Sequence, residues 1–439
     1  MRWRSDLDRP IAALAVPALG ALVAEPLYVL ADTAIVGHLG TRPLAGLAVA
    51  GIVLTAAFSL CNFLAYATTG AVARRTGAGQ HREAVAIGID GAWLAAGIGV
   101  VLAALGVVGA PWIVDAMGAS ARVHPDAVTY LRIGALGAPA FLVMFAGTGF
   151  LRGRLDTRTT LVIAVAANVV NLVLEVVLVY GFRLGIAGSA WGTVVAQVLA
   201  GAVYVAILRR AARSTGATVR PDRRGIATVA RVGAPLAVRT GSLLAVSVTT
   251  TALAARIGDV AVAAHQIAFQ VNLLLALVLD ALAIAGQALV GRALGADDAP
   301  AARSVERRLV ALGVVLGLGL AVVLAATAPW FPAVFTGSPG VRHLTTQVLW
   351  IVAAMQPLAA VVFVLDGVLI GAGDQRYLAW AMVVASFGVF APVAAGVTVA
   401  GGGLLALWGA IAAWLVARGV GMVGRARTDR WLVTGAVRS

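Results

Sequence analysis

Lysine is absent from this chain, cysteine occurs once, and charged residues make up only 12% of its 439 positions. A soluble protein carries roughly 25% charged residues, so the composition argues against a soluble fold. With Cys61 alone, neither a disulfide framework nor a cysteine metal site can form. The net charge of +14 comes entirely from arginines, which lie in short loops between apolar segments. We therefore expect no nucleic-acid partner.

Long apolar runs dominate what is present, since 61% of the residues are hydrophobic. A helix needs about 20 apolar residues to cross a bilayer, and each run is of about that length. The pattern predicts an all-α integral membrane protein with twelve transmembrane helices. We expect them at about residues 11–39, 44–70, 84–110, 127–151, 159–180, 185–208, 232–256, 261–290, 309–329, 344–370, 378–399 and 404–424.

An internal repeat relates the two halves of the chain at a constant offset of 218 residues. Each half holds six predicted spans, an even number, so both enter the membrane from the same side. This predicts two parallel six-helix lobes related by an axis along the membrane normal, an arrangement that transporters use. The expected lobes are residues 1–212 and 232–439, joined by an arginine-rich linker, 213–231. Matching pairs include Pro17 with Pro235, Gly40 with Gly258, Pro139 with Pro357, Gly149 with Gly367, and Gly153 with Gly371.

Arginine placement predicts the orientation, because cytoplasmic loops carry an excess of positive charge. With the N-terminus inside, 26 arginines fall in or beside inner segments and only six in or beside outer ones. We expect a multi-pass protein of the plasma (inner) membrane with both termini cytoplasmic. No small-residue cleavage site follows the N-terminal residues, so the first span is expected to be retained.

Acidic residues stand inside the spans of the first half. Asp32 lies about 21 residues into the first span, and Glu25 precedes it by seven residues, on the same helix face. Asn171 and Glu175 are four apart in the fifth span, at similar depth, and Asn168 continues their stripe. The repeat-equivalent positions in the second half carry no acid.

A carboxylate within a membrane costs about 2.5–3.5 kcal/mol on insertion scales, so it usually faces protein or water and is functional. Carboxyl groups buried close together resist ionising at the same time. Asp32, Glu175, Asn171 and Glu25 are therefore candidates for an ion-coupling cluster in a proton-driven carrier. The same oxygens could bind sodium instead, and a purely structural hydrogen-bonded pair is the remaining alternative.

The second half has its own buried charges, Arg239, Asp280 and Asp366, all in the predicted inner half of the membrane. An arginine with a nearby aspartate usually forms a structural pair. The alternative is a cytoplasmic gate or part of a substrate path, to which Gln266 and Gln270 could add polar groups. These five residues are the candidate substrate path or gate.

Pro17 and Pro26 interrupt backbone hydrogen bonding in the span that carries Asp32, and are candidate hinges. No catalytic motif, phosphate-binding loop or histidine metal spacing is present in the sequence. We expect neither an enzyme nor a bound metal or cofactor. The energy for transport would come from an ion gradient.

Three segments resemble the MATE (multidrug and toxic compound extrusion) transporters. LADTAIVGHLG, with Pro17 fifteen residues before Asp32, is similar to their first helix, and NVVNLVLEVVLV to their fifth. LDGVLIGAGDQR, from Leu365, is similar to their tenth. The resemblance covers nearly the whole chain, and the surroundings of Arg239 and Asp280 point to the DinF-like (DNA-damage-inducible F) branch.

The resemblance implies cation-coupled antiport, with Asp32, Asn171 and Glu175 responding to the ion. Glu175 stands where the family usually has Asp, and Glu25 where an uncharged polar residue is common. We therefore expect a monomeric antiporter, surrounded by membrane lipid, that exports organic, often cationic, small molecules. H+ is favoured over Na+ as the coupling ion. The alternative function is a flippase for a lipid-linked precursor, although the mostly acidic interior charges favour the antiporter.

Overall fold

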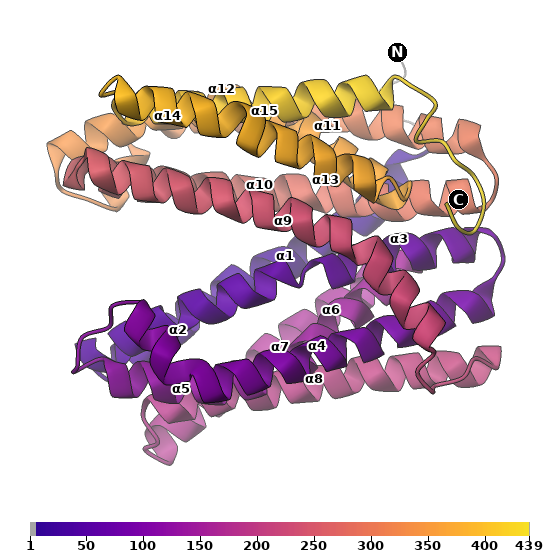
Figure 1. Cartoon of the computed structure of the whole chain (residues 1–439), viewed down its shortest axis with the longest axis horizontal. Coiled ribbons are helices and arrows are strands. Elements are labelled where there is room, and N and C mark those ends of the chain that lie inside the picture. Colours follow the sequence, from indigo (N-terminus) through magenta and orange to yellow (C-terminus); the bar gives the residue numbers. More distant parts are fainter. Residues whose placement is uncertain (1–5, 439) are drawn as a thin grey trace. The chain divides into compact units, whose positions relative to one another are not determined.

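The computed structural model describes residues 6–438, which are helical almost throughout and include no β-strand (Figure 1). Eleven helical segments are long and apolar enough to cross a membrane, and a bent helix pair raises the number to twelve. The predicted fold class is thereby confirmed. The chain ends of the predicted lobes, residues 1–5 and 439, lie outside the described residues.

The first six spans follow the predicted boundaries to within several residues. The second and fourth spans are each made of two helices, and the fifth ends in a short π-helical segment, η1. In order they are α1 (Asp8–Gly37), α2 (Thr41–Leu60) with α3 (Phe63–Gly77), α4 (His81–Ala116), α5 (His124–Leu136) with α6 (Ala138–Gly153), α7 (Thr157–Val176) with η1 (Val177–Gly181), and α8 (Ile186–Thr215).

The last six spans follow in the same way, with a short 3-10 helix, η2, and a second π-helical segment, η3. They are α9 (Arg223–Ile257), α10 (Asp259–Gly295), α11 (Ala299–Thr327) followed by η2 (Phe331–Val334), α12 (Pro339–Gly371), α13 (Gln375–Val383) with η3 (Val384–Phe390) and α14 (Ala391–Val399), and α15 (Leu404–Ala426).

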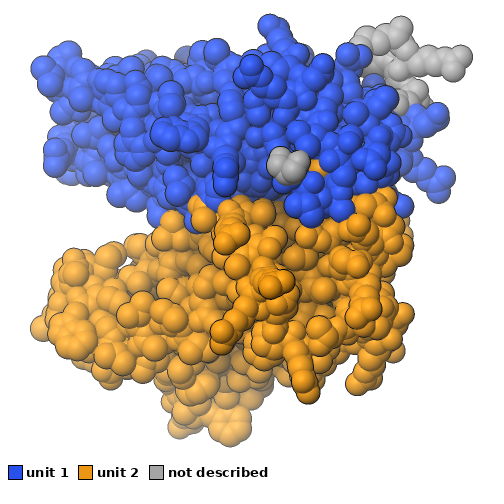
Figure 2. All heavy atoms as spheres, turned by 45° about the vertical axis from the view of Figure 1, so that its right-hand side comes forward, with its two compact units in different colours: residues 1–15, 235–439 blue, residues 16–234 orange. Residues whose placement is uncertain are grey.

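The chain divides into two compact units, coloured in Figure 2. The N unit is Val16–Ala234, and the C unit is Pro235–Ser439 together with the chain up to Ala15. This differs from the predicted lobes because α1 and α9 are continuous helices that each contribute residues to both units. The expected linker is also shorter, since α8 continues to Thr215 and α9 already begins at Arg223.

What remains of the linker is fastened to α4 within the N unit. The backbone N–H of Asp222 donates to Asp90 Oδ1 at 3.0 Å, and Trp93 Nε1 donates to the carbonyl of Val219 at 3.0 Å. The buried acid of the third span, Asp90, therefore has a structural partner. A linker held in this way is an ordered connection rather than a loose tether.

The same close contacts recur in both units at the offset of 218 residues. A Cβ added at Gly149 or Gly153 would collide with the carbonyl of Ala65 or Thr69 on α3, and one added at Gly367 or Gly371 with the equivalent carbonyls of α10. Glycine is required where backbones approach this closely. The turn glycines Gly40 and Gly258 also match, with φ of 119° and 142°. The internal repeat of the sequence therefore corresponds to the same helix contacts and turns in both units.

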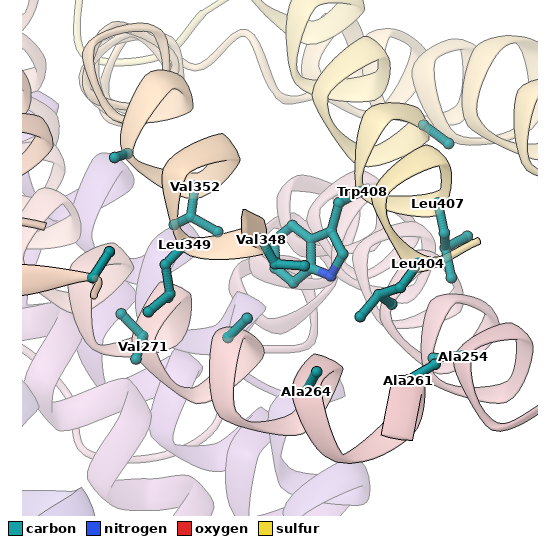
Figure 3. Packing of buried hydrophobic residues seen from close by; sticks show 14 of the residues in the cluster. Ala254, Ala261, Ala264, Val271, Val348, Leu349, Val352, Leu404, Leu407 and Trp408 are labelled. Atoms are coloured by element: carbon teal, nitrogen blue, oxygen red, sulfur yellow. The ribbon is translucent and has the colours of Figure 1, made fainter. Parts of the chain in front are cut away.

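Each unit buries its own apolar core. In the C unit α10, α11 and α15 all pack against α12 (Figure 1). Trp408 is fully buried there, with its indole beside Val348 and other residues of α10, α12 and α15 (Figure 3). In the N unit α3 and α4 pack against α6, and α7 packs against α8. These packed helices hold the polar side chains of the candidate sites.

Candidate ion-coupling site

Asp32 lies buried in the N unit, 5% exposed, and receives hydrogen bonds from two other helices. Ser189 Oγ on α8 donates to Asp32 Oδ1 at 2.6 Å. Tyr130 OH on α5 donates to Asp32 Oδ2 at 3.4 Å. The carboxyl group of α1 is therefore held by hydroxyls and has no basic residue bonded to it among the described residues.

Thr193 on α8 connects the other polar groups of this site. Its Oγ1 lies 2.8 Å from Tyr28 OH and 3.5 Å from Glu175 Oε1, and it accepts a hydrogen bond from Asn171 Nδ2 at 3.2 Å. Glu175 is fully buried and Asn171 is 4% exposed. We call Asp32, Glu175, Asn171, Ser189, Thr193, Tyr28 and Tyr130 the acid cluster.

Asp32 and Glu175 are both held by α8, one helical turn apart, Asp32 through Ser189 and Glu175 through Thr193. Glu175 Oε2 and Asn171 Oδ1 are buried with no hydrogen-bond partner among the described residues. Within those residues no group of three His, Cys, Asp or Glu side chains could hold a metal ion. The available chemistry is thus a carboxyl pair with free oxygen acceptors in an apolar surrounding.

Helix spacing explains how α7 contributes to this cluster. Asn168, Asn171 and Glu175 lie on one stripe, as expected from the sequence, and the stripe faces α1 and α8. Asn168 Nδ2 donates to the carbonyl of Ala24 on α1 at 2.8 Å. Directly after Glu175 the helix changes to the π-helical segment η1, where Tyr180 OH donates to the carbonyl of Ile35 at 2.9 Å. Both contacts tie α7 to the helix that carries Asp32.

Glu25 is the predicted member that the structure does not bring into the acid cluster. Its side chain is exposed and makes no hydrogen bond or ion pair within the described residues. Seven residues separate it from Asp32, about 10 Å along the helix at 1.5 Å per residue. A shared helix face therefore places the two acids in line without placing them in contact.

In the C unit, Arg239 pairs with Asp366, both buried. Arg239 Nε donates to Asp366 Oδ1 at 3.0 Å and Nη2 donates to Oδ2. A second arginine, Arg418 on α15, lies with Nη2 3.7 Å from Asp366 Oδ2. Asp280 is half-buried on α10. The sequence analysis grouped Arg239, Asp280 and Asp366 and did not include Arg418. Whether these residues form a gate stays a prediction.

Gln266 and Gln270, predicted to line a cavity, are both exposed on α10. The cavity of this unit is lined on that helix by Phe269, Asn272 and residues further along. The two glutamines lie on a different face of the helix. Whether they contribute to a substrate path stays a prediction.

The hydroxyl groups of the acid cluster escaped the sequence analysis, because serine, threonine and tyrosine are common in membrane helices. A usable signal was present in the spacing. Ser189 and Thr193 are four apart, as are Tyr28 and Asp32, and such pairs share a helix face. Arg418 was missed because it is close enough to the C-terminal end of its span to be counted with the cytoplasmic flank.

Comparisons with known proteins add to this geometry. The MatE family model matches residues 17–177 and again 235–395. Both ends of the second match lie 218 residues beyond those of the first, which is the offset of the internal repeat. The two matches together cover well over half of the chain.

Among curated proteins, Protein DETOXIFICATION 44, chloroplastic, from Arabidopsis thaliana is 32% identical over 389 residues, covering 86% of this chain and 74% of that protein. DNA damage-inducible protein F of Escherichia coli is 27% identical, covering 96% and 92%. A solved structure described as MATE in the bent conformation has a TM-score of 0.88 at 22% identity, covering 96% of each chain. The chain therefore belongs to the MatE family of multi-span membrane transporters, whose members are transporters and not enzymes.

Proposed function

We propose that this protein is a proton-coupled antiporter that exports organic small molecules across the plasma membrane by alternating access. The observation that carries the proposal is the buried carboxyl pair of Asp32 and Glu175, which hydroxyls surround and no arginine neutralises among the described residues. Two buried carboxyl groups side by side resist ionising together, so one proton is readily held between them. Reversible binding of one proton is what a proton-coupled carrier requires.

The cycle follows from the placement of the pair. A proton from the outer side binds to the carboxyl pair and makes its charge one unit less negative, and the changed hydrogen bonds of α1 favour release of the exported compound. Reorientation then exposes the pair to the inner side, where the proton is lost and another compound binds. The arginine distribution predicts cytoplasmic termini and places Asp32 in the outer half of α1, which suits proton loading from outside.

Two features of α1 and α7 fit a movable site. Pro17 and Pro26 both lie inside α1, and each removes one backbone hydrogen bond from it. Glu175 is followed by the π-helical segment η1, a form that often occurs at functional sites. Bending of α1 would change the distance from Asp32 to Ser189 and Tyr130, and so would change how tightly the proton is held.

Export of an organic compound from proteoliposomes tests this proposal, with a pH gradient imposed in sodium-free buffer and, in a separate experiment, a sodium gradient imposed at uniform pH. We expect an inward proton gradient to drive export, and a sodium gradient alone to drive none. Transport that needs sodium and ignores the pH gradient would recast the acid cluster oxygens as sodium ligands. Movement of a lipid-linked precursor without any ion gradient would support the flippase instead.

A further inference from the structure

The C unit contains a partly open cavity of about 180 Å³ lined by residues of α9, α10, α12 and α15. It is distinct from the acid cluster, which lies in the N unit. Its walls are mostly apolar and include the aromatic side chains of Phe269, Phe363, Trp408 and Trp414. An engineered cavity of about 150 Å³ with apolar walls binds benzene, so this one has room for a single aromatic ring with a short chain.

One charged side chain, Arg418 on α15, lines this cavity. It is 4% exposed, and its guanidinium stacks on the Trp414 ring with 4.7 Å between the Cζ atom and the ring centroid. Its Nε is buried with no hydrogen-bond partner among the described residues. A buried charged donor without an acceptor is costly, which makes such a group a candidate for ligand binding.

The carboxylate nearest to Arg418 is already engaged by another arginine. Asp366 accepts from both Nε and Nη2 of Arg239, whereas Arg418 Nη2 lies 3.7 Å from it. That separation exceeds the usual range of a hydrogen bond. The guanidinium of Arg418 therefore keeps most of its donors for another acceptor, and planar guanidinium groups bind carboxylate or phosphate oxygens in pairs.

The remaining polar side chains of the cavity are uncharged. They are Ser247, Thr250, Asn272, Gln356 and Trp408. Trp408 precedes Arg418 by ten residues on α15, about 15 Å along the helix. The cavity thus combines one cationic group with a few neutral polar groups and apolar walls.

We propose that this cavity binds an amphipathic organic anion, with a single carboxylate or similar group on Arg418 and an aromatic body between the apolar walls. The proposal names a substrate class for the exporter proposed above and differs from the cationic preference expected from sequence. That expectation came from the resemblance to the family, whereas this proposal comes from the side chains that line the cavity. Binding in this cavity does not depend on which ion drives transport.

Equilibrium binding to the full chain in lipid nanodiscs tests the proposal without any gradient. Radiolabelled 3-phenylpropionate is the probe, and 3-phenylpropan-1-ol and 3-phenylpropylamine are competitors of the same skeleton with a neutral or cationic end. We expect saturable binding of the anion, with the alcohol at least ten-fold weaker as a competitor and the amine weaker still. Empty nanodiscs correct for partition into lipid.

Variants assign the preference to Arg418. Arg418→Gln should weaken 3-phenylpropionate at least ten-fold while leaving the alcohol unchanged, and Arg418→Lys should keep the order of the three compounds. Arg342→Gln removes an equal charge from an exposed position on α12, and should change nothing. If Arg418→Gln does not fold, Ala276→Leu, which fills the cavity without altering charge, should weaken the anion and the alcohol together.

In the wild-type protein, the relative affinities of the three compounds already test whether the cavity prefers an anion. Absence of saturable anion binding, or competition by the amine equal to that of the anion, would overturn the proposal. Equal loss of binding in Arg418→Gln and Arg342→Gln would mean attraction by net charge alone. None of these results would bear on proton coupling, which the transport experiment tests separately.

Discussion

Glu175 is placed to change how readily Asp32 takes up a proton. Glu175→Gln keeps the side-chain shape and the contact with Thr193 but removes a neighbouring negative charge. Protonation of Asp32 is then less favoured, and we expect the external pH of half-maximal efflux to fall. Efflux from proteoliposomes at a series of external pH values measures this. Glu83→Gln, an exposed change on α4, is the control, and identical pH curves for wild type and Glu175→Gln would contradict the prediction.

The ion pair of Arg239 and Asp366 leads to a prediction about stability. Breaking a buried pair by removing one partner costs about 3–5 kcal/mol, because the other charge is left buried. Asp366→Leu removes the carboxylate that both Arg239 and Arg418 face, whereas Arg239→Leu removes only one of the two arginines beside it. We expect Asp366→Leu to lower the unfolding temperature more than Arg239→Leu does.

The double variant completes this thermodynamic cycle. Arg239→Leu with Asp366→Leu should be more stable than Asp366→Leu alone, since it removes one of the two buried arginines that face position 366. Thermal unfolding in detergent measures all three variants. Strictly additive losses would show that the two side chains do not stabilise each other.

The sequence singles out a residue most readily where a polar or charged group stands in an apolar run. Asp32, Asn171 and Glu175 could be singled out because polar groups inside a membrane are costly and seldom without purpose. Ser189, Thr193, Tyr28 and Tyr130 were not singled out, since hydroxyl groups are common in membrane spans and only their four-residue spacing marked them. Glu25 lies outside the hydrogen bonds of the cluster because a shared helix face does not imply contact, and its role in ion coupling stays a prediction.

At the scale of helices, two glycines at equivalent positions of the repeat, Gly99 and Gly317, lead to the same prediction in each unit. A Cβ at Gly99 on α4 would collide with Pro139, and one at Gly317 on α11 would lie 2.9 Å from Pro357 Cα. Overpacking typically costs about 1–3 kcal/mol, so Gly99→Ala and Gly317→Ala should both lower the unfolding temperature.

Two neighbouring glycines are the controls for this prediction. Gly97 and Gly319 are exposed on the same two helices, and a Cβ added at either would have nothing within 4 Å. Alanine there should be neutral or stabilising by about 0.5–1 kcal/mol, because glycine loses more backbone entropy on folding. Equal effects of alanine at all four positions would contradict the close helix contact that we describe within each unit.

The hinge role of Pro26 is a second prediction about a helix. Pro26→Ala allows a hydrogen bond to the carbonyl of Leu22 and should stiffen α1. We expect a several-fold slower export rate with an unchanged or higher unfolding temperature. Pro111→Ala, which alters a proline inside α4, should export at the normal rate. Normal export by Pro26→Ala would show that α1 need not bend there.

Helix boundaries were largely predictable, because each span is an apolar run between arginines, glycines and prolines. The break between α5 and α6 was not. Its proline, Pro139, matches Pro357, which lies inside the uninterrupted helix α12. The first half has Gly134 and Gly137 before its proline, where the second half has Val352 and Met355, so the backbone bends by 48° only in the first.

For the whole molecule, the repeat predicted two six-span units, and the family match at the same offset agrees with it. The boundaries of the two units were harder to predict, because α1 and α9 each contribute residues to both units. An apolar run in a sequence does not indicate where along a helix its packing partners change. The orientation in the membrane stays a prediction from the arginine distribution.

The central claim is that export of an organic compound is coupled to proton movement through Asp32. Counterflow tests it most directly. An exported compound is placed at high concentration inside sodium-free proteoliposomes of uniform pH, and a trapped dye reports the internal pH. Because antiport is reversible, outflow of the compound should drive protons inward and acidify the interior in the wild type. Asp32→Asn should abolish this acidification, and Asp115→Asn, an exposed change on α4, should preserve it. Outflow of the compound without acidification, or acidification that persists in Asp32→Asn, would contradict the account.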